Sequence, residues 1–332
     1  MKLASIEKIK SVIKHPNADA LDIVTVLGYQ AIVKRDQYKE GDLILFIQPD
    51  TVLPDAPWAS MYKAKSKRVK AIKLRGSWSM GIVESLSILP ASCVPSVIDD
   101  SDVGDDVSNA LGVTKYEPPI PQDLSAKGNL PCGIMKTDEE RYQNINNLPF
   151  GEIVDVTLKV DGSSMTVYCK KVIDEYQVGV TSRSLELKLD KENKYTAMVN
   201  KLNLLDKLKA YCNTNNVNIA IRGELYGNGI QRFKLNPHAT KPLGFAVFNV
   251  LNLDTLKYEG TDSPLYYEKV AQDLNLEIVA MVEKGVVLTP ELIKKYDEGI
   301  DKINGAFFEG VVIKLGNGNS FKIINKHYDS LK

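Results

Sequence analysis

The sequence predicts an α+β protein in which a small all-β barrel is followed by a larger domain of antiparallel sheets with flanking helices. Residues 1 to about 95 contain about five short β-rich runs broken by turns, with almost no helical periodicity, as in small barrels. From about residue 136 onward, β-rich runs alternate with helical stretches. The length of 332 residues also exceeds that of one ordinary domain.

The composition is that of an ordinary globular protein, with 44% hydrophobic and 25% charged residues. No apolar run approaches the roughly 18–20 residues that span a bilayer. The first residues are charged and lack an apolar signal core, which predicts a cytoplasmic protein. The four cysteines contain no CxxC pair, which argues against a zinc site or a disulfide framework. The 42 basic and 42 acidic side chains balance, so only their distribution is informative.

The expected strands of the first domain cover residues 23–26, 31–33, 43–47, 69–74 and 81–83. Seven cations and no acid lie in residues 61–75, namely Lys63, Lys65, Lys67, Arg68, Lys70, Lys73 and Arg75. They alternate with Val69, Ile72 and Leu74, which predicts a strand with one cationic face. Two interpretations stay open, a solvated strand and a phosphate-facing surface.

A run of five aspartates in residues 99–106 predicts a linker, because like charges repel and little there can be buried. The Pro- and Gly-rich residues 113–135 extend it. We therefore expect a barrel domain at 1–98, a linker at 99–135 and a second domain at 136–332. In the second domain, residues 195–212 predict a helix, and Thr289, Pro290 and Glu291 predict the start of another.

The most informative segment is VDVTLKVDGSSMTVY at residues 154–168, which predicts two strands joined at Asp161 and Gly162. Lys159 ends the first strand, with Asp161 two residues further on. A lysine beside a glycine turn is usually a surface residue, so this string alone is weak evidence for a site.

Further segments place a charged or aromatic residue in or next to an otherwise apolar strand. They read TSRS (with Arg183), IAIRGELYG (with Glu224), GFAVFNV (with Phe248), FEGVVIK (with Glu309 and Lys314) and SFKIIN (with Lys322). Buried charges persist when they are paired or bind something charged. Together these segments predict a polar site between sheets.

In this order and spacing the segments resemble the nucleotidyltransferase motifs of polynucleotide ligases and mRNA capping enzymes, which form a lysyl-nucleotide intermediate. KVDG resembles motif I, SRS the arginine motif, RGELYG motif III, FAVFNV motif IIIa, FEGVVIK motif IV and SFKII motif V. The resemblance covers about residues 155–326. It implies an ATP-grasp-like nucleotidyltransferase domain in which a lysine attacks the α-phosphate of ATP, and AMP then passes to a 5′-phosphate end that a 3′-hydroxyl seals.

The resemblance implies catalytic roles for Lys159, Asp161, Arg183, Glu224, Glu309 and Lys322. It implies nucleotide contacts from Lys159, Leu158, Gly162, Arg183, Glu224, Phe248, Lys314, Lys322 and Lys326. An ordinary lysine has a pKa of about 10.4, so a neutral amine needs a nearby cation. We therefore expect Asp161, Glu224 and Glu309 to hold hydrated Mg²⁺ or Mn²⁺ through water. Leu158, Asn249 and Ile324 depart from the commonest motif residues, and Lys326 is the weakest assignment.

The first domain resembles the OB domain at the front of the RNA ligase 5 family, and KYEPPIP and KTDEERYQN in the connector also resemble that family. The resemblance implies a substrate of RNA, or an RNA/DNA duplex, nicked with RNA on the 3′-hydroxyl side. We expect Lys67, Arg68, Lys70, Lys73 and Arg75 to contact phosphates. We also expect a monomer with no membrane and no obligate protein partner. The alternatives are a DNA ligase or guanylyltransferase using the same half-reaction, or a non-catalytic OB-fold RNA-binding protein.

Overall fold

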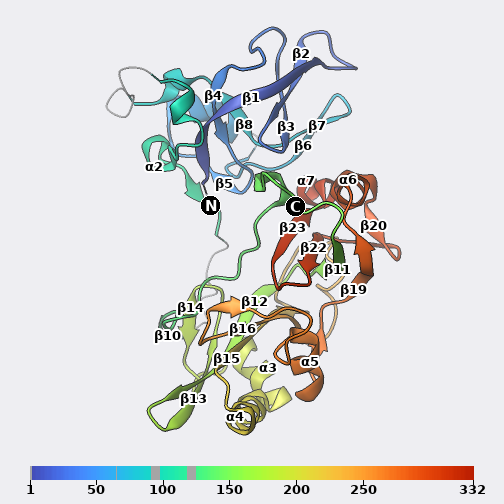
Figure 1. Cartoon of the computed structure of the whole chain (residues 1–332). Coiled ribbons are helices and arrows are strands. Elements are labelled where there is room, and N and C mark those ends of the chain that lie inside the picture. The colour runs from blue at the N-terminus through green and yellow to red at the C-terminus, as the bar shows by residue number, and fades with distance from the viewer. Residues whose placement is uncertain (1, 65, 91–97, 118–124) are drawn as a thin grey trace. The chain divides into compact units, whose positions relative to one another are not determined.

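A computed structural model describes residues 2–64, 66–90, 98–117 and 125–332 (Figure 1). The chain divides into two compact units. Unit 1 comprises Met1–Pro119, Arg141–Leu148 and Asp329–Lys332, and unit 2 comprises Ile120–Glu140 and Pro149–Tyr328. Among the described residues, no helix is both long enough and apolar enough to cross a membrane.

Unit 1 is built on a five-stranded antiparallel sheet. Its strands, in spatial order, are β3 (Tyr29–Lys34), β2 (Leu21–Val26), β1 (Ala4–Lys14), β4 (Leu43–Ile47) and β8 (Ile82–Glu84). The long strand β1 pairs with β4 through its first half and with β2 through its second half. The register shifts between Ile9 and Ser11, and such a bulge bends a strand so that it can serve both halves of a barrel.

A hairpin of β6 (Ile72–Leu74) and β7 (Ser77–Ser79) brings the barrel close to closure. The Met80 N–H donates to the Gln30 carbonyl at 2.8 Å, and the Ile32 N–H donates to the Ser79 hydroxyl at 3.0 Å. The interior is filled by apolar side chains from β1, β2, β3, β4, β7 and β8. The β barrel predicted from the sequence is therefore confirmed.

The basic segment 61–75 is not the continuous strand that its alternation predicted. Ser60–Lys63 forms helix α1, and only Ile72–Leu74 is a strand. The apolar residues do not share one face, because Val69 is buried whereas Ile72 is exposed. The two residues are three positions apart, so the apolar residues do not keep a spacing of two along the segment. Lys65 lies outside the described residues.

The segment expected to be a linker contributes side chains to both units. In unit 1 it forms the 3-10 helix η4 (Asp100–Asp102) and helix α2 (Ser108–Leu111), after which Val113 is buried. The Asp99 side chain caps η4, and the Ile6 N–H of β1 donates to the Asp105 carbonyl at 3.0 Å. Aspartates that cap helices need no burial of their charge. None of residues 99–106 is buried, as expected, whereas Leu111 and Val113, which follow the aspartate run, are buried.

The described part of unit 1 contains further short elements. They are strands β5 (Thr51–Val52) and β9 (Thr114–Lys115), which pair with each other, and the 3-10 helices η1 (Pro57–Ala59) and η2 (Leu86–Ile88). A further 3-10 helix, η5 (Tyr142–Asn144), belongs to the same unit. Its Gln143 carbonyl accepts the Gly28 N–H at 3.1 Å, which attaches this later segment to the β2–β3 turn.

Unit 2 contains a large sheet and a smaller one. The eight-stranded sheet consists of β10 (Ala126–Asn129), β14 (Leu185–Leu187), β13 (Glu175–Thr181), β12 (Ser163–Val172), β15 (Ile219–Tyr226), β16 (Gly244–Asn252) and β17 (Lys257–Tyr258), with β18 (Glu277–Ile278) pairing with β16. The four-stranded antiparallel sheet has the order β19 (Met281–Val287), β11 (Ile153–Lys159), β22 (Gly310–Leu315) and β23 (Ser320–Ile324). A short hairpin joins β20 (Lys302–Ile303) to β21 (Ala306–Phe307).

The helices of unit 2 are short. They are α3 (Lys194–Leu202), α4 (Leu204–Asn215), α5 (Tyr267–Asp273), α6 (Pro290–Lys294) and the π-helical turn η6 (Lys295–Gly299), while α7 (Lys326–Leu331) begins in unit 2 and ends in unit 1. Helices α3, α4 and α5 lie against the large sheet (Figure 1), and their buried apolar side chains belong to the same core cluster as those of its strands. The helix predicted at 195–212 is two helices, separated at Asn203, which has a φ of 48°. The predicted cap is confirmed, since the Thr289 side chain accepts the Leu292 N–H.

Candidate active site

The segment that carries Lys159 passes from one sheet to the other. Strand β11 belongs to the four-stranded sheet and β12 to the eight-stranded sheet, so the two predicted strands exist but do not pair with each other. Asp161 and Gly162 form the crossing between the sheets. Lys159, the last residue of β11, therefore lies where the two sheets meet.

The register of the smaller sheet places several cations on one face. Lys159 lies opposite Gly310, and Val312 lies between Thr157 on β11 and Lys322 on β23. Because alternate residues of a strand point the same way, Lys159, Lys314 and Lys322 share a face. Glu309 directly precedes Gly310, and its Oε2 lies 2.5 Å from the Lys159 Nζ. Lys159 and Glu309, both predicted as site residues, therefore form a direct ion pair.

Glu224 reaches the same place from the larger sheet. In the β12–β15 pair, Ser163 lies opposite Leu225 and Ser164 opposite Glu224. Gly162 is packed so closely that a Cβ there would lie 2.4 Å from the Leu225 carbonyl oxygen and 2.8 Å from the Glu224 Cγ. Only glycine fits this crossing without displacing its neighbours. The KVDG motif thus meets the Glu224 carboxylate because it has no side chain at its last position.

The charges in this cluster do not balance. Burial raises the pKa of Glu224 to about 8; Lys159 opposes the rise, while the carboxylates of Glu309 and Asp161 add to it. Burial acts to lower the pKa of Lys159, but its acidic neighbours, led by Glu309, outweigh burial and raise it. One ammonium thus faces three carboxyl groups, a set that attracts a further cation.

The turn beside Lys159 is held by side chains that the sequence did not identify. The Tyr328 hydroxyl donates to the Asp161 Oδ2 at 2.7 Å, and the Asn236 Nδ2 donates to the Asp161 carbonyl at 2.7 Å. The Gln231 Nε2 donates to the Gly162 carbonyl at 2.6 Å. These donors come from the loop after β15 and from α7. No periodicity marks loop residues of this kind, so sequence reasoning had no signal for them.

Two predicted cations share one carboxylate. Lys322 Nζ lies 3.2 Å from one oxygen of Asp138, and Arg183 Nη2 lies 3.4 Å from the other. The segment before Arg141 is attached to β23, because the Lys322 N–H donates to the Glu140 carbonyl at 2.8 Å. Asp138 was not predicted as a site residue; the only signal was its place in the KTDEERYQN string.

Phe248 and Lys314 are brought together as well. The Phe248 ring is partly buried against a cluster that includes Val160, the residue after Lys159. Lys314 Nζ donates to the Phe248 carbonyl at 2.6 Å and lies 4.5 Å from the centre of the Tyr267 ring. Phe248 is therefore positioned near the lysine-bearing turn, as the sequence suggested.

Two predicted nucleotide contacts are engaged with other parts of unit 2. The Leu158 N–H donates to the Ala280 carbonyl at 2.8 Å, which occupies the backbone donor. Lys326 Nζ forms ion pairs with Asp297 at 2.6 Å and with Glu298 at 3.2 Å.

The carboxylates could hold a divalent cation through water. In the described parts of the chain, no three His, Cys, Asp or Glu side chains converge closely enough to bind a metal directly. The excess of negative charge around Lys159 nevertheless fits a hydrated cation, since Mg²⁺ dehydrates reluctantly and often binds through its waters. Asp161, Glu224 and Glu309 are the residues that would face it.

The basic side chains of unit 1 differ in whether they are bound to other residues of the unit. Arg68 is bound to Asp50 through Nε at 2.9 Å and Nη2 at 2.5 Å, and its guanidinium lies 4.8 Å from the centre of the Tyr116 ring. Lys73 lies over the Trp78 ring at 5.3 Å and is exposed. Arg68 therefore supports the fold of unit 1, whereas Lys73 can face a ligand.

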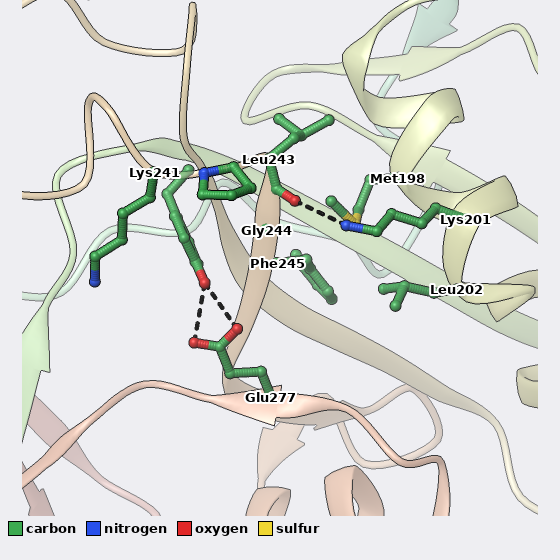
Figure 2. A pocket seen from close by; sticks show the side chains of 10 residues that line it. Met198, Lys201, Leu202, Lys241, Leu243, Gly244, Phe245 and Glu277 are labelled. Carbon is green, nitrogen blue, oxygen red and sulfur yellow. Dashed lines mark hydrogen bonds between the residues drawn. The ribbon is translucent and has the colours of Figure 1, made fainter.

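A pocket of about 300 Å³ lies elsewhere in unit 2. Figure 2 shows Met198, Lys201 and Leu202 of α3 on one side of it and Glu277 of β18 on another. Tyr226 and Glu277 both line it, and the Tyr226 hydroxyl donates to the two Glu277 carboxylate oxygens at 2.7 and 3.0 Å. None of the predicted site residues lines this pocket.

Comparison with known proteins agrees with this geometry. A family model described as RNA ligase matches residues 152–324, and one described as an OB-fold domain matches residues 3–86. No curated protein matches the chain.

Several solved structures are similar over the whole chain. A Naegleria gruberi RNA ligase variant in the apo state is 27% identical, with a TM-score of 0.82, covering 99% of this chain and 98% of that one. Another variant, solved with ATP and Mn, is 27% identical, with a TM-score of 0.81 and the same coverage. The Naegleria enzyme with pyrophosphate is 28% identical, with a TM-score of 0.80, again over 99% and 98%.

Proposed function

This chain belongs to the RNA ligase family, and from that premise we propose that it seals nicks between a 3′-hydroxyl and a 5′-phosphate through lysyl-AMP and RNA-adenylate intermediates. It is an enzyme, an ATP-dependent RNA ligase, with an OB-like barrel ahead of its ligase domain. The observation that carries the mechanism is the Lys159 amine, which lies 2.5 Å from Glu309 and has its pKa raised by Glu309, Glu224 and Asp161. Of the alternatives left open by the sequence, the family match selects the RNA ligase.

In the first step, the Lys159 nitrogen attacks the α-phosphorus of ATP. A nitrogen–phosphorus bond forms, the bond from the α-phosphorus to its bridging oxygen breaks, and pyrophosphate leaves. The amine must give up its proton, yet the acidic neighbours raise its pKa and so favour the ammonium form. Bound Mg²⁺ or Mn²⁺ supplies positive charge that favours the neutral amine and balances the phosphates. Asp161, Glu224 and Glu309 would hold it through water.

The remaining site residues have proposed roles that follow from their positions. Lys322 and Arg183 neutralise the charge that builds on the transferred phosphate, with Asp138 keeping both extended in the free enzyme. The Phe248 ring stacks on adenine. A nucleotide contact from Gly162 would come from its backbone, since Leu225 and Glu224 fill the space that a Cβ would take. Nucleotide contacts from Leu158 and Lys326 require local rearrangement, since both have protein partners. The predicted nucleotide contact from Lys314 would likewise compete with its bond to the Phe248 carbonyl.

We propose that residues 1–98 bind the nicked duplex and residues 136–332 carry out the chemistry, with 99–135 connecting them. The candidate phosphate contacts are Lys67, Lys70, Lys73 and Arg75, with Arg68 supporting them from its pair with Asp50. Phosphate contacts position a substrate without reading its sequence, which suits a repair enzyme. A monomer acting on its own in the cytoplasm, where ATP is supplied, accords with this proposal.

The test uses nicked duplexes that differ only at the 3′-hydroxyl terminus. With ATP and Mg²⁺ or Mn²⁺, we expect sealing when that nucleotide is a ribonucleotide and much weaker sealing when it is a deoxyribonucleotide. Self-adenylylation is followed in parallel with labelled ATP and labelled GTP. Equal sealing of both nicks would contradict the proposed substrate, and labelling by GTP alone would contradict the proposed cosubstrate.

A further inference from the structure

Lys314 is a buried cation that links the two sheets of unit 2. Its side chain extends from β22, on the same face of the small sheet as Lys159. Four residues separate Lys314 from Gly310, the partner of Lys159, which is about 13 Å along a strand. Lys314 is 7% exposed, so its amine lies inside the domain and not at the surface.

The partner of this amine belongs to the other sheet. In the β15–β16 pair, Arg222 lies opposite Asn249 and Gly223 opposite Val247, which leaves Phe248 as the extra residue of a β-bulge. A bulge removes a residue from the ladder and re-aims its side chain. The Phe248 carbonyl at this bulge accepts the Lys314 amine at 2.6 Å.

A second contact holds the amine in place. The Lys314 Nζ lies 4.5 Å from the centre of the buried Tyr267 ring, within the range of a cation–π interaction. Burial lowers the pKa of Lys314 to about 8, although nearby carboxylates act in the opposite direction. Either protonation form of the amine can donate to the carbonyl, so the contact with Phe248 survives across neutral pH.

We propose that Lys314 is a positioning residue for the nucleotide base: it ties the Phe248 bulge of the large sheet to β22 of the small sheet, and it does not contact phosphate. The inference rests on the proposed function, because it assumes that adenine stacks on Phe248. Lys159 and Phe248 lie on different sheets, and the bond from Lys314 to the Phe248 carbonyl joins those sheets. The bond therefore sets the position of the base relative to the attacking amine.

The test measures binding of the base and binding of the phosphates separately. Adenosine and inorganic tripolyphosphate are used as competitive inhibitors of self-adenylylation at saturating metal. Lys314→Met should raise the inhibition constant of adenosine roughly 10- to 100-fold, the loss expected for a buried charged hydrogen bond, and leave that of tripolyphosphate within about 2-fold. Lys322→Met should give the reverse pattern, and Lys257→Met, on the exposed part of β17, should change neither.

A double-mutant cycle adds an independent readout. In a Phe248→Ala background, Lys314→Met should have no further effect on adenosine, because the ring that it positions is gone. Weaker binding of tripolyphosphate in Lys314→Met, or additive effects on adenosine in the cycle, would overturn the inference. If Lys314→Met does not fold, Lys314→Gln is used, because glutamine retains a hydrogen-bond donor. This variant should also raise the inhibition constant of adenosine and not that of tripolyphosphate, by a smaller factor. Wild-type enzyme that forms no adduct with ATP would instead refute the proposed function.

Discussion

Replacing Glu224 with glutamine should change how the stability of the protein depends on pH. In the folded protein, burial raises the pKa of Glu224 to about 8, with Glu309 and Asp161 adding to the rise, whereas the ordinary value is 4.5. Between these two values the folded state binds a proton that the unfolded chain has released. Rising pH therefore favours unfolding of the wild type in this interval.

The size of the effect follows from the same pKa. At about 1.36 kcal/mol per pH unit, a rise from 4.5 to about 8 corresponds to a folded state destabilised by about 4–5 kcal/mol above pH 8. Between about pH 6 and pH 8.5, the wild type should lose about 2–3 kcal/mol more than Glu224→Gln. The raised pKa of Lys159 does not contribute here, because its stabilising effect is lost only above its ordinary pKa. The lowered pKa of Lys314 is common to both proteins and cancels in the comparison.

The assay is urea denaturation of wild type and Glu224→Gln at about pH 6 and pH 8.5, without divalent cations. Glu192→Gln, which removes an exposed carboxylate, serves as the control and should follow the wild type. Adding Mg²⁺ or Mn²⁺ should narrow the gap at the higher pH, because a cation favours the carboxylate form. Parallel pH profiles for the wild type and Glu224→Gln would refute the crowded carboxyl cluster, and with it the reason for expecting a cation there.

Other predictions concern the shape of the turn and the choice between cations. Gly162→Ala puts a Cβ 2.8 Å from the Glu224 Cγ, so self-adenylylation should fall about 100-fold, as for a reacting group misplaced by an ångström; an unchanged single-turnover rate would contradict this steric argument. Asn236→Ala leaves the buried Asp161 carbonyl without that donor and should lower the free energy of unfolding by about 1–3 kcal/mol in urea titrations, whereas an identical midpoint would show that the bond is not needed. Lys322→Met should slow lysyl-AMP formation more than Lys326→Met, because Lys326 is paired with Asp297. The rates are measured with labelled ATP, and equal losses in the two variants would indicate that Lys326 also contacts the nucleotide.

The sequence could identify residues that break a local pattern. Glu224 was found because a charge interrupts the buried strand β15, and Glu309 because it opens an apolar one. The barrel was found because its short runs repeat with turns between them. In each of these the signal lies within a few neighbouring residues, where periodicity and the energetic penalty of burying a charge apply.

What the sequence missed depends on contacts between distant segments. Tyr328 reaches Asp161 across 167 positions and Asn236 reaches the same residue across 75, and nothing local distinguishes either from an ordinary loop or helix residue. The two strands predicted at 154–168 are present, but nothing local shows that they enter different sheets. Two adjacent strands can enter different sheets, and alternation within each strand does not say which partner it takes.

The most direct test of the mechanism is the intact mass of the full chain after incubation with ATP and Mg²⁺ or Mn²⁺. The wild type should gain one AMP, peptide mapping should place it on Lys159, and Lys159→Met should gain none while still folding. A modification on any other residue, or an adduct of undiminished yield in Lys159→Met, would contradict the assignment of Lys159 as the nucleophile.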